Sequence, residues 1–279
     1  GGIITGNKVL TLNYKAIHVL NSDGIIIANN MAIGTGTGAV EVVRMENNTN
    51  THFVNNSILC ANTNTTSIGL NFIHTYAVTN NRVWNNIIQT NSLGSAIKFQ
   101  QYTAQTNWLK ANVYFYSGTN LGQYNGSTIA NITAWKTASN SDSASFVINP
   151  QFYSSTNLHA NEYLINNKAV PVLDDISDDF DGQVRSLTSP DIGADEFNLM
   201  SVDAATNGFN FSSILCSGSN SIHVVLKNNG TTTLTSATLG CKVNSTVLSN
   251  YNWSGSLASV TQTIVTIGSY NFLANTNYA

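Results

Sequence analysis

The sequence carries little charge for its 279 residues. Acidic and basic side chains make up 9% of it, against about 25% in a typical soluble domain. The net charge is −3 and the 11 Lys and Arg residues are scattered, which excludes a basic patch for nucleic acid. No apolar run approaches the roughly 18 residues that a membrane-crossing helix needs. We therefore expect neither a nucleic-acid partner nor a transmembrane segment.

Cysteine is scarce, and the three present are too few to form a disulfide framework. Cys60, Cys216 and Cys241 have no metal-binding spacing. We expect Cys60 to be buried, and whether Cys216 and Cys241 pair is left open. No signal peptide is visible in the sequence, which starts with Gly-Gly-Ile-Ile inside what we expect to be structure. It stops inside a predicted strand as well, so we expect a piece of a longer protein.

Asparagine is what the sequence has in abundance, with 41 residues, about one in seven. Asparagine is a poor former of helix interiors and of strands, but it tolerates left-handed turns and bonds to nearby backbone groups. A fold that uses so many must contain many tight turns. The composition therefore predicts an all-β protein.

Five segments of the first half repeat one another around a shared asparagine. Stacked coils would place these asparagines about 4.8 Å apart, so that their amides can bond along the stack. We expect a structural ladder with spacings of 23, 26, 30 and 26 residues. Its members are Asn7, Asn30, Asn56, Asn86 and Asn112.

A second set of repeated positions follows each ladder residue with an apolar–polar–apolar pattern, which is typical of a strand with one buried face. We therefore predict a parallel β-helix with two strands per turn. The expected inward columns are Ile17, Val40, Leu70 and Ile97, and Val19, Val42, Phe72 and Phe99. The expected outward column is His18, Glu41, Asn71 and Lys98.

Residues 1–197 resemble the right-handed parallel β-helix repeat proteins that bacteria secrete, the pectin-lyase-like superfamily, which includes pectate lyases and polygalacturonases. The resemblance is carried by a segment ending in Trp135, by Asn149-Pro150-Gln151-Phe152, and by a terminal signature. That signature is 180–185, Phe-Asp-Gly-Gln-Val-Arg, followed by 190–197, Pro-Asp-Ile-Gly-Ala-Asp-Glu-Phe. The resemblance implies the fold and a secreted, extracellular context.

Residues 198–279 resemble the immunoglobulin-like adhesion modules of bacterial surface proteins, of the CARDB type. Short strand patterns recur at sandwich spacing, as in 222–231 and 264–268. The fold class we predict is thus all-β, a right-handed parallel β-helix (1–197) followed by an immunoglobulin-like β-sandwich (198–279). Such architectures are often exported by a dedicated sorting domain, so the resemblance implies a type 9 secretion substrate that meets outer-membrane export machinery.

An enzyme of this fold would need carboxylates around the scissile bond. Of the 14 acidic residues, the coils hold only Asp23, Glu41 and Glu46. No catalytic residue of the resembled family transfers to this sequence. We leave the enzyme question open and favour a non-enzymatic adhesin or scaffold at the cell surface, with polysaccharide or cell-surface glycan as partner. The alternative is a polysaccharide lyase or glycoside hydrolase with its catalytic coils upstream.

Several further residues have two interpretations each. The outward column His18, Glu41, Asn71 and Lys98 can bind a glycan or can be a solvated sheet face. Asp178, Asp179 and Asp181 can bind calcium, the one cofactor considered. In the structural alternative, Asp181 is in a turn, while Arg185 pairs with Asp191, Asp195 or Glu196 and seals the open end of the solenoid.

Two weaker signals complete the sequence-based predictions. Ser143 lies in Asp142-Ser143-Ala144, which resembles an O-glycosylation acceptor of secreted bacterial proteins. The aromatic residues near the end of the coils can stack on sugar rings or lie buried under loops. They are Tyr102, Trp108, Tyr114 and Tyr116.

Overall fold

The computed structural model describes residues 1–76, 78–91, 93–101, 108–172, 176–210, 216–274 and 276–278. It divides into two compact units, Gly1–Phe197 and Asn198–Ala279. In the described ranges the helices are α1 (Ile132–Ser139) and the single 3₁₀ turn Tyr163–Ile165, and all other regular structure is β-strand. The all-β class predicted from composition is confirmed.

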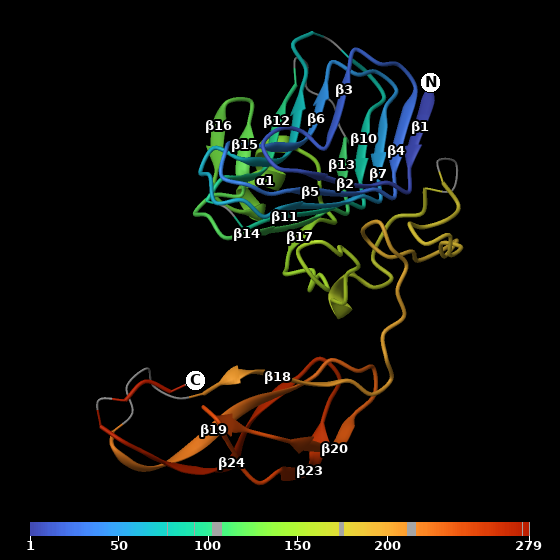
Figure 1. Cartoon of the computed structure of the whole chain (residues 1–279). Helices are drawn as coiled ribbons and strands as arrows, with labels where there is room; N and C mark the ends of the chain where they lie inside the picture. Colours follow the sequence, from blue (N-terminus) through green and yellow to red (C-terminus); the bar gives the residue numbers. More distant parts are fainter. Residues whose placement is uncertain are drawn as a thin grey trace. The chain divides into compact units, whose positions relative to one another are not determined.

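The first unit is a parallel β-solenoid in which successive turns lie side by side (Figure 1). Each turn contributes one strand to each of three sheets. The first sheet contains β1 (Gly2–Thr5), β4 (Ile25–Ala28), β7 (His52–Val54), β10 (Arg82–Trp84) and β13 (Leu109–Lys110). The second contains β2 (Lys8–Thr11), β5 (Met31–Gly34), β8 (Ser57–Cys60), β11 (Ile87–Thr90), β14 (Val113–Tyr116) and β17 (Phe146–Val147). The third contains β3 (Ile17–Leu20), β6 (Glu41–Glu46), β9 (Ile68–Ile73), β12 (Ser95–Gln100), β15 (Gly122–Tyr124) and the antiparallel β16 (Ser127–Ile129).

A left-handed residue separates the first-sheet strand from the second-sheet strand in every turn. The predicted two strands per turn are wrong for this reason: the corner divides each segment aligned around the asparagine column into two strands. Asparagine tolerates positive φ better than most residues do, so it is well suited to this corner. The corner residues are Gly6, Asn29, Asn55, Asn85 and Ala111, with φ between 52° and 64°.

The residue after each corner belongs to a hydrogen-bonded ladder of asparagines. Nδ2 of Asn7 donates to Oδ1 of Asn30, and Asn30 donates to Asn56 in the same way, both at 3.0 Å. The bonds from Asn56 to Asn86 and from Asn86 to Asn112 measure 3.1 Å. The Oδ1 atoms of the last four members also accept the backbone N–H of the ladder residue one turn earlier. Buried amides therefore fix the register of one turn on the next.

Apolar side chains fill the solenoid and stack along its length. The rings of Phe72 and Phe99 are parallel with centroids 5.0 Å apart, and those of Phe99 and Tyr124 lie 5.9 Å apart. Trp108 meets Phe99 edge to face. These contacts extend one inward column from β9 to β15, as the alternating pattern predicts for Phe72 and Phe99.

The predicted register of β6 is wrong by three residues. Ile17 pairs with Val43 and Val19 with Met45, in place of Val40 and Val42. The sequence Val40-Glu41-Val42-Val43-Arg44-Met45 satisfies the apolar–polar–apolar pattern twice. Both Val42 and Val43 are buried, and the sequence pattern alone does not distinguish the two alignments.

Helix α1 packs against the last turn of the solenoid. The Oδ1 of Asn131 accepts from the backbone N–H of Ala134 at 3.0 Å and so caps the helix. Trp135 is fully buried and meets the rings of Tyr114 and Tyr124 edge to face. This side chain, rather than an ion pair, covers the interior at the end of the coils.

Residues 149–172 and 176–197, called the outer segment here, lie along the outside of the coils, on the second sheet and in part on the first. Leu158 and Ala194 of the outer segment pack on Met31, Ile33 and Leu59 of the sheet. Farther along, its Ala160, Ile165 and Ile192 pack on Ile87 and Val113. This packing explains why both faces of the second-sheet strands are apolar.

The predicted role of Arg185 as a seal on the solenoid end is wrong, because Arg185 fastens the outer segment to the side of the coils. Its Nη2 donates to Oδ1 of the corner residue Asn29 and to the carbonyl of Gly193, both at 2.8 Å. Its Nη1 lies 3.8 Å from Oε1 of Glu196 and donates to the backbone carbonyl of Asp191 at 3.3 Å. Of the three predicted partners, Glu196 forms the ion pair.

The second unit contains antiparallel sheets, which suggest a β-sandwich. Its core includes Val224, Leu226, Leu257, Val265 and Phe272. One sheet has the order β18-β19-β24, and β20-β23 and β21-β22 form two-stranded sheets. The strands are β18 (Ala204–Phe209), β19 (Gly218–Asn228), β20 (Leu234–Leu239), β21 (Lys242–Val243), β22 (Thr246–Val247), β23 (Tyr251–Leu257) and β24 (Gln262–Phe272).

Candidate functional site

The third sheet brings together most of the predicted outward column. His18 pairs in register with Arg44, Arg44 with Asn71, and Asn71 with Lys98. Because of the shift in β6, Arg44 holds the place that the sequence pattern gives to Glu41. Glu41 remains close, since its Oε1 accepts from Nδ2 of Asn71 at 2.7 Å.

Arg44 joins the two carboxylates of this face. Its Nη1 donates to Oε1 and Oε2 of Glu41 at 3.1 and 2.9 Å, and its Nε donates to Oε2 of Glu46 at 2.8 Å. Hydrogen bonds from Arg44 hold the pKa of Glu46 below its ordinary value. General acid catalysis on a glycoside needs one protonated carboxyl group. A pair of carboxylates bound to one guanidinium does not fit that role, and the network fits a structural ion cluster better.

The aromatic residues near the end of the coils are mostly inside the protein. Trp108 is 3% exposed and Tyr114 is fully buried, so neither offers a face to a sugar. Tyr116 packs partly against the same core. Tyr102 lies outside the described residues. The alternative of burial is therefore the correct one for Trp108 and Tyr114.

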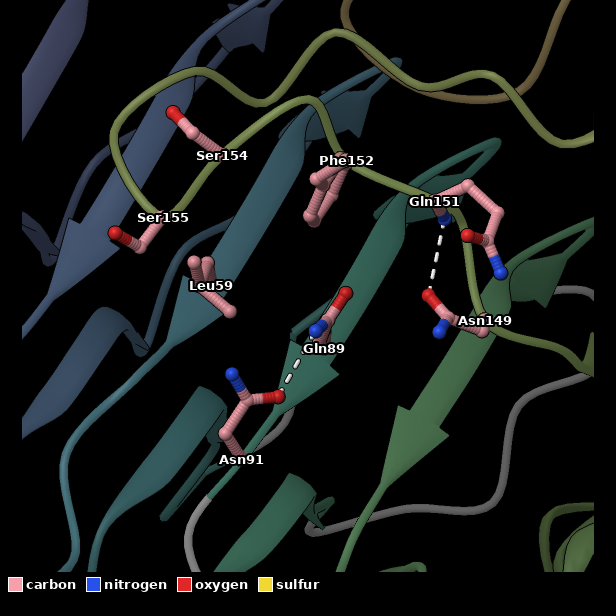
Figure 2. A pocket seen from close by; sticks show the side chains of 8 residues that line it. All are labelled: Leu59, Gln89, Asn91, Asn149, Gln151, Phe152, Ser154 and Ser155. Carbon is pink, nitrogen blue, oxygen red and sulfur yellow. Dashed lines mark hydrogen bonds between the residues drawn. The ribbon is translucent and has the colours of Figure 1, made fainter. Parts of the chain in front are cut away.

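A pocket of about 230 Å³ opens on the outer face of the second sheet, where residues 149–155 cross it (Figure 2). Gln89 follows Leu59 in register along this face, while Phe152 comes from the crossing loop. Every lining side chain is neutral. The lining consists of Leu59, Gln89, Asn91, Asn149, Gln151, Phe152, Ser154 and Ser155.

Gln89 is the most informative residue of the pocket. It is 9% exposed, and its Nε2 donates to Oδ1 of Asn91 at 2.8 Å. Its Oε1 is buried and receives no hydrogen bond within the described part of the chain. Such an unpaired acceptor costs about 1–3 kcal/mol, and a donor from a ligand can satisfy it. The sequence analysis did not single out Gln89. It used the motif Asn149–Phe152, which lines the same pocket, only as evidence for the fold.

The chemistry of the pocket suits a polyhydroxylated, uncharged ligand. Amide and hydroxyl groups both donate and accept hydrogen bonds, as sugar hydroxyls do. Leu59 and Phe152 supply an apolar surface for the C–H face of a ring. At about 30 Å³ per water molecule, the volume equals that of seven or eight waters, which is enough for one sugar ring.

The acidic turn separates the predicted calcium ligands from one another. The carboxylate of Asp179 accepts three backbone N–H groups, from Asp181 at 2.9 Å, Gln183 at 2.7 Å and Glu196 at 2.8 Å. Asp178 accepts from the hydroxyl of Ser177 at 3.1 Å. Among the described residues, the group that gathers metal-ligand atoms is His159, Asp181 and Asp195.

Asp191 and Asp195 are both buried within the outer segment. Asp191 accepts the backbone N–H groups of Asn167 and Phe197, yet burial raises its pKa to about 7. Burial also raises the pKa of Asp195 to about 7, with His159 opposing the shift and the carboxylates of Asp179 and Asp181 adding to it. Asp191 thus joins residues 167 and 197 of the outer segment through backbone hydrogen bonds.

The remaining predicted residues have simple surroundings. Ser143 is exposed, whereas the preceding Asp142 is buried and accepts from Oη of Tyr114 at 2.6 Å. Asp142 thus has a structural role whether or not Ser143 is modified. Cys60 is buried as expected, and the exposed Cys216 and the half-buried Cys241 are both free thiols.

No protein-family model, no curated protein and no solved structure matches the chain. Across the described residues, no helix combines the length and the apolar character that membrane crossing requires.

Proposed function

We propose that this chain is a non-enzymatic adhesin or scaffold of the bacterial cell surface, whose right-handed β-helix holds a neutral glycan in the pocket around Gln89. The observation that carries the proposal is the lining itself: six amide or hydroxyl side chains around Leu59 and Phe152, with no charged group among them. Small-molecule pockets are usually lined mainly by apolar groups. A pocket so rich in amides favours a ligand that is itself rich in hydroxyl groups.

The buried Oε1 of Gln89 supports this assignment. A sugar hydroxyl can donate to it while accepting from Nδ2 of a neighbouring asparagine. The site is built from a rigid strand on one side and the crossing loop on the other, so part of its geometry is already formed. Pre-formed geometry lowers the entropy cost of binding a small ligand.

The charged face of the third sheet supports a non-catalytic role. Glu41 and Glu46 are hydrogen-bonded to Arg44, and the bond from Arg44 lowers the pKa of Glu46. We propose that His18, Asn71 and Lys98 belong to this ion cluster rather than to a glycan site.

The surface location and the second module belong to the same proposal. The low charge, the terminal signature 180–197 and the antiparallel sheets of the second unit support an exported protein with an immunoglobulin-like spacer. Recognition by outer-membrane export machinery follows from the same resemblance.

A glycan array followed by isothermal titration tests the proposal. The test variant is Gln89→Met, which keeps the volume and removes the amide. The control is Gln100→Ala, because Gln100 is an exposed amide on the third sheet. We expect wild type and control to bind the same neutral glycan, and Gln89→Met to bind about tenfold more weakly, since one lost hydrogen bond is worth up to about 1.5 kcal/mol.

Turnover is measured with the same glycans by reducing-end and unsaturated-product assays. Binding without products supports the proposal. Cleavage of any glycan by the protein would overturn it in favour of a polysaccharide lyase or glycoside hydrolase.

A further inference from the structure

We propose that His159, Asp181 and Asp195 form a site for one divalent metal ion of the zinc class. The three residues come from two parts of the outer segment that lie 22 positions or more apart in sequence. One ligand atom from each, an imidazole nitrogen and two carboxylate oxygens, lies within 4.8 Å of the others. The site would tie the loop that carries Phe152, Ser154 and Ser155 to the segment fastened on the coils by Arg185.

One pair of ligand atoms, which share a hydrogen bond, already lies close to the spacing of a metal site. Nε2 of His159 and Oδ2 of Asp181 are 2.9 Å apart. Two ligands at about 2.1 Å from one zinc ion stand roughly 3.0 to 3.4 Å apart for angles between 90° and the tetrahedral value. The separations to the Asp195 carboxylate are within 4.8 Å, so they must shorten by up to about 1.4 Å to complete the set. Asp181 is on the solvent side, with 44% of its side chain exposed, which leaves an entry path.

The hydrogen bond from His159 to Asn157 determines which ring nitrogen is available to bind a metal ion. Oδ1 of Asn157 accepts from the backbone N–H of His159 at 3.3 Å, so this atom is oriented as an acceptor. The same Oδ1 lies against Nδ1 of His159, and Nδ1 must therefore carry a proton. In the neutral imidazole the lone pair is then on Nε2, which points to Asp181. Metal-bound histidines commonly donate their other ring N–H to an oxygen in this way.

Asp195 is the buried member of the set. Its residue is 7% exposed, and its carboxyl group faces that of Asp179, whereas the oxygens of Asp179 and Asp191 accept backbone N–H groups. A buried carboxylate beside other carboxylates is costly unless it is paired or bound to a metal.

The mixed ligand set favours the zinc class over calcium. Calcium takes six to eight oxygen ligands, and Asp179, the nearest further carboxylate, is already used by three backbone N–H groups. Zinc accepts imidazole nitrogen together with carboxylate oxygen and often keeps one position open for water. The ring of Tyr153 stacks on the imidazole of His159, and the ring of Phe180 meets the imidazole edge to face.

The full chain, stripped with a chelator, is titrated with Zn²⁺ by calorimetry, and Co²⁺ is used as a spectroscopic probe. The test variants are Asp195→Asn and His159→Gln. The control is His223→Gln, whose imidazole bonds to Thr266 in the second unit. We expect one Zn²⁺ per chain, a Co²⁺ absorption band typical of low coordination number, and at least roughly tenfold weaker binding in both test variants.

Circular dichroism and thermal melts in chelator show whether the variants fold, and Asp195→Asn is expected to be as stable as wild type there. A folded Asp195→Asn with unchanged Zn²⁺ affinity would overturn the site. So would Ca²⁺ binding in preference to Zn²⁺, or no zinc-dependent rise in the melting temperature. A proton shared between His159 and Asp181 is the alternative these results would support. The metal assay does not depend on glycan binding, so either proposal can fail alone.

Discussion

Nδ2 of Asn112 donates to Oδ1 of Asp142 at 3.1 Å, so the asparagine ladder ends on a buried carboxylate. The other oxygen of Asp142 accepts from Oη of Tyr114 at 2.6 Å and from Nε1 of Trp135 at 2.8 Å. The ladder of aligned amides thus ends on a carboxyl group that accepts from Asn112, Tyr114 and Trp135 at the point where α1 covers the interior. Burial raises the pKa of this carboxyl group.

Replacing Asp142 is expected to release this end of the solenoid. Asp142→Ala leaves the indole, phenol and amide donors unpaired in the interior, and each buried unpaired group costs about 1–3 kcal/mol. We expect a loss of about 3–5 kcal/mol of unfolding free energy in urea titrations. Asp23→Ala, which removes an exposed bond to Asn50, is the control and should cost less than about 1 kcal/mol. Equal losses in both variants would contradict this role.

The loss of unfolding free energy on replacing a ladder asparagine is expected to depend on how deep that asparagine lies in the stack. Asn56 donates to Ile27 O, Val54 O and Asn86 Oδ1 and is buried, whereas Asn7 lies at the exposed end. We expect Asn56→Ala to cost about 3–5 kcal/mol and Asn7→Ala about 1 kcal/mol or less. Chemical denaturation of the two variants side by side measures the difference. The ladder has no energetic importance if both changes are equally mild.

Because His74 is buried, the protein is expected to lose folding stability in acid, in the pH range where histidine titrates. Its ring lies between Phe72 and Trp108 at 4.7 and 5.1 Å, and burial lowers its pKa from 6.5 to about 4. The unfolded chain therefore takes up the proton first, so stability is complete above about pH 6.5 and falls as the pH approaches 4. The shift corresponds to about 3 kcal/mol.

The measurement is unfolding free energy as a function of pH for wild type, His74→Phe and His223→Gln. His74→Phe should flatten the curve between pH 6.5 and pH 4, whereas His223→Gln, at a half-buried position of the second unit, should leave it steep. An identical slope in all three proteins would assign the acid sensitivity to other groups.

Replacing Arg185 is expected to loosen the outer segment without unfolding the coils. Its guanidinium bridges Asn29 of the coils and Gly193 of the outer segment, and removing one partner of a buried charged network typically costs about 3–5 kcal/mol. We expect Arg185→Met to increase hydrogen exchange in residues 177–197 while the inner strands stay protected. Limited proteolysis should cut the variant in the same range. Uniform loss of protection throughout the solenoid would place Arg185 in the global core instead.

The repeat and the ladder were predictable because they depend on side chains that recur at a readable spacing. The five asparagines can be recognised from their recurring spacing in the sequence, and the alternating pattern indicates the inward faces of β9 and β12. The register of β6 was not predictable, because Val40–Val42 and Val43–Met45 have the same pattern. Which alignment wins depends on how the preceding loop reaches the strand, a property of three-dimensional packing.

The candidate sites were harder to predict for a related reason. The pocket joins Gln89 to residues 149–155, and the triad joins His159 to Asp181 and Asp195. Neither constellation has a spacing signal, because the outer segment folds back across several turns. Gly193 shows how close that contact is: with φ of 107°, a Cβ there would lie 2.6 Å from Cδ1 of Ile87. The signature 190–197 carries that glycine, but its docking partner is visible only in the fold.

Hydrogen exchange with and without the glycan selected on the array tests the central claim most directly. The account predicts new protection confined to residues 57–62, 87–91 and 149–155, which surround the pocket. Protection centred on His18, Arg44, Asn71 and Lys98 of the third sheet, or limited to residues 198–279, would contradict it.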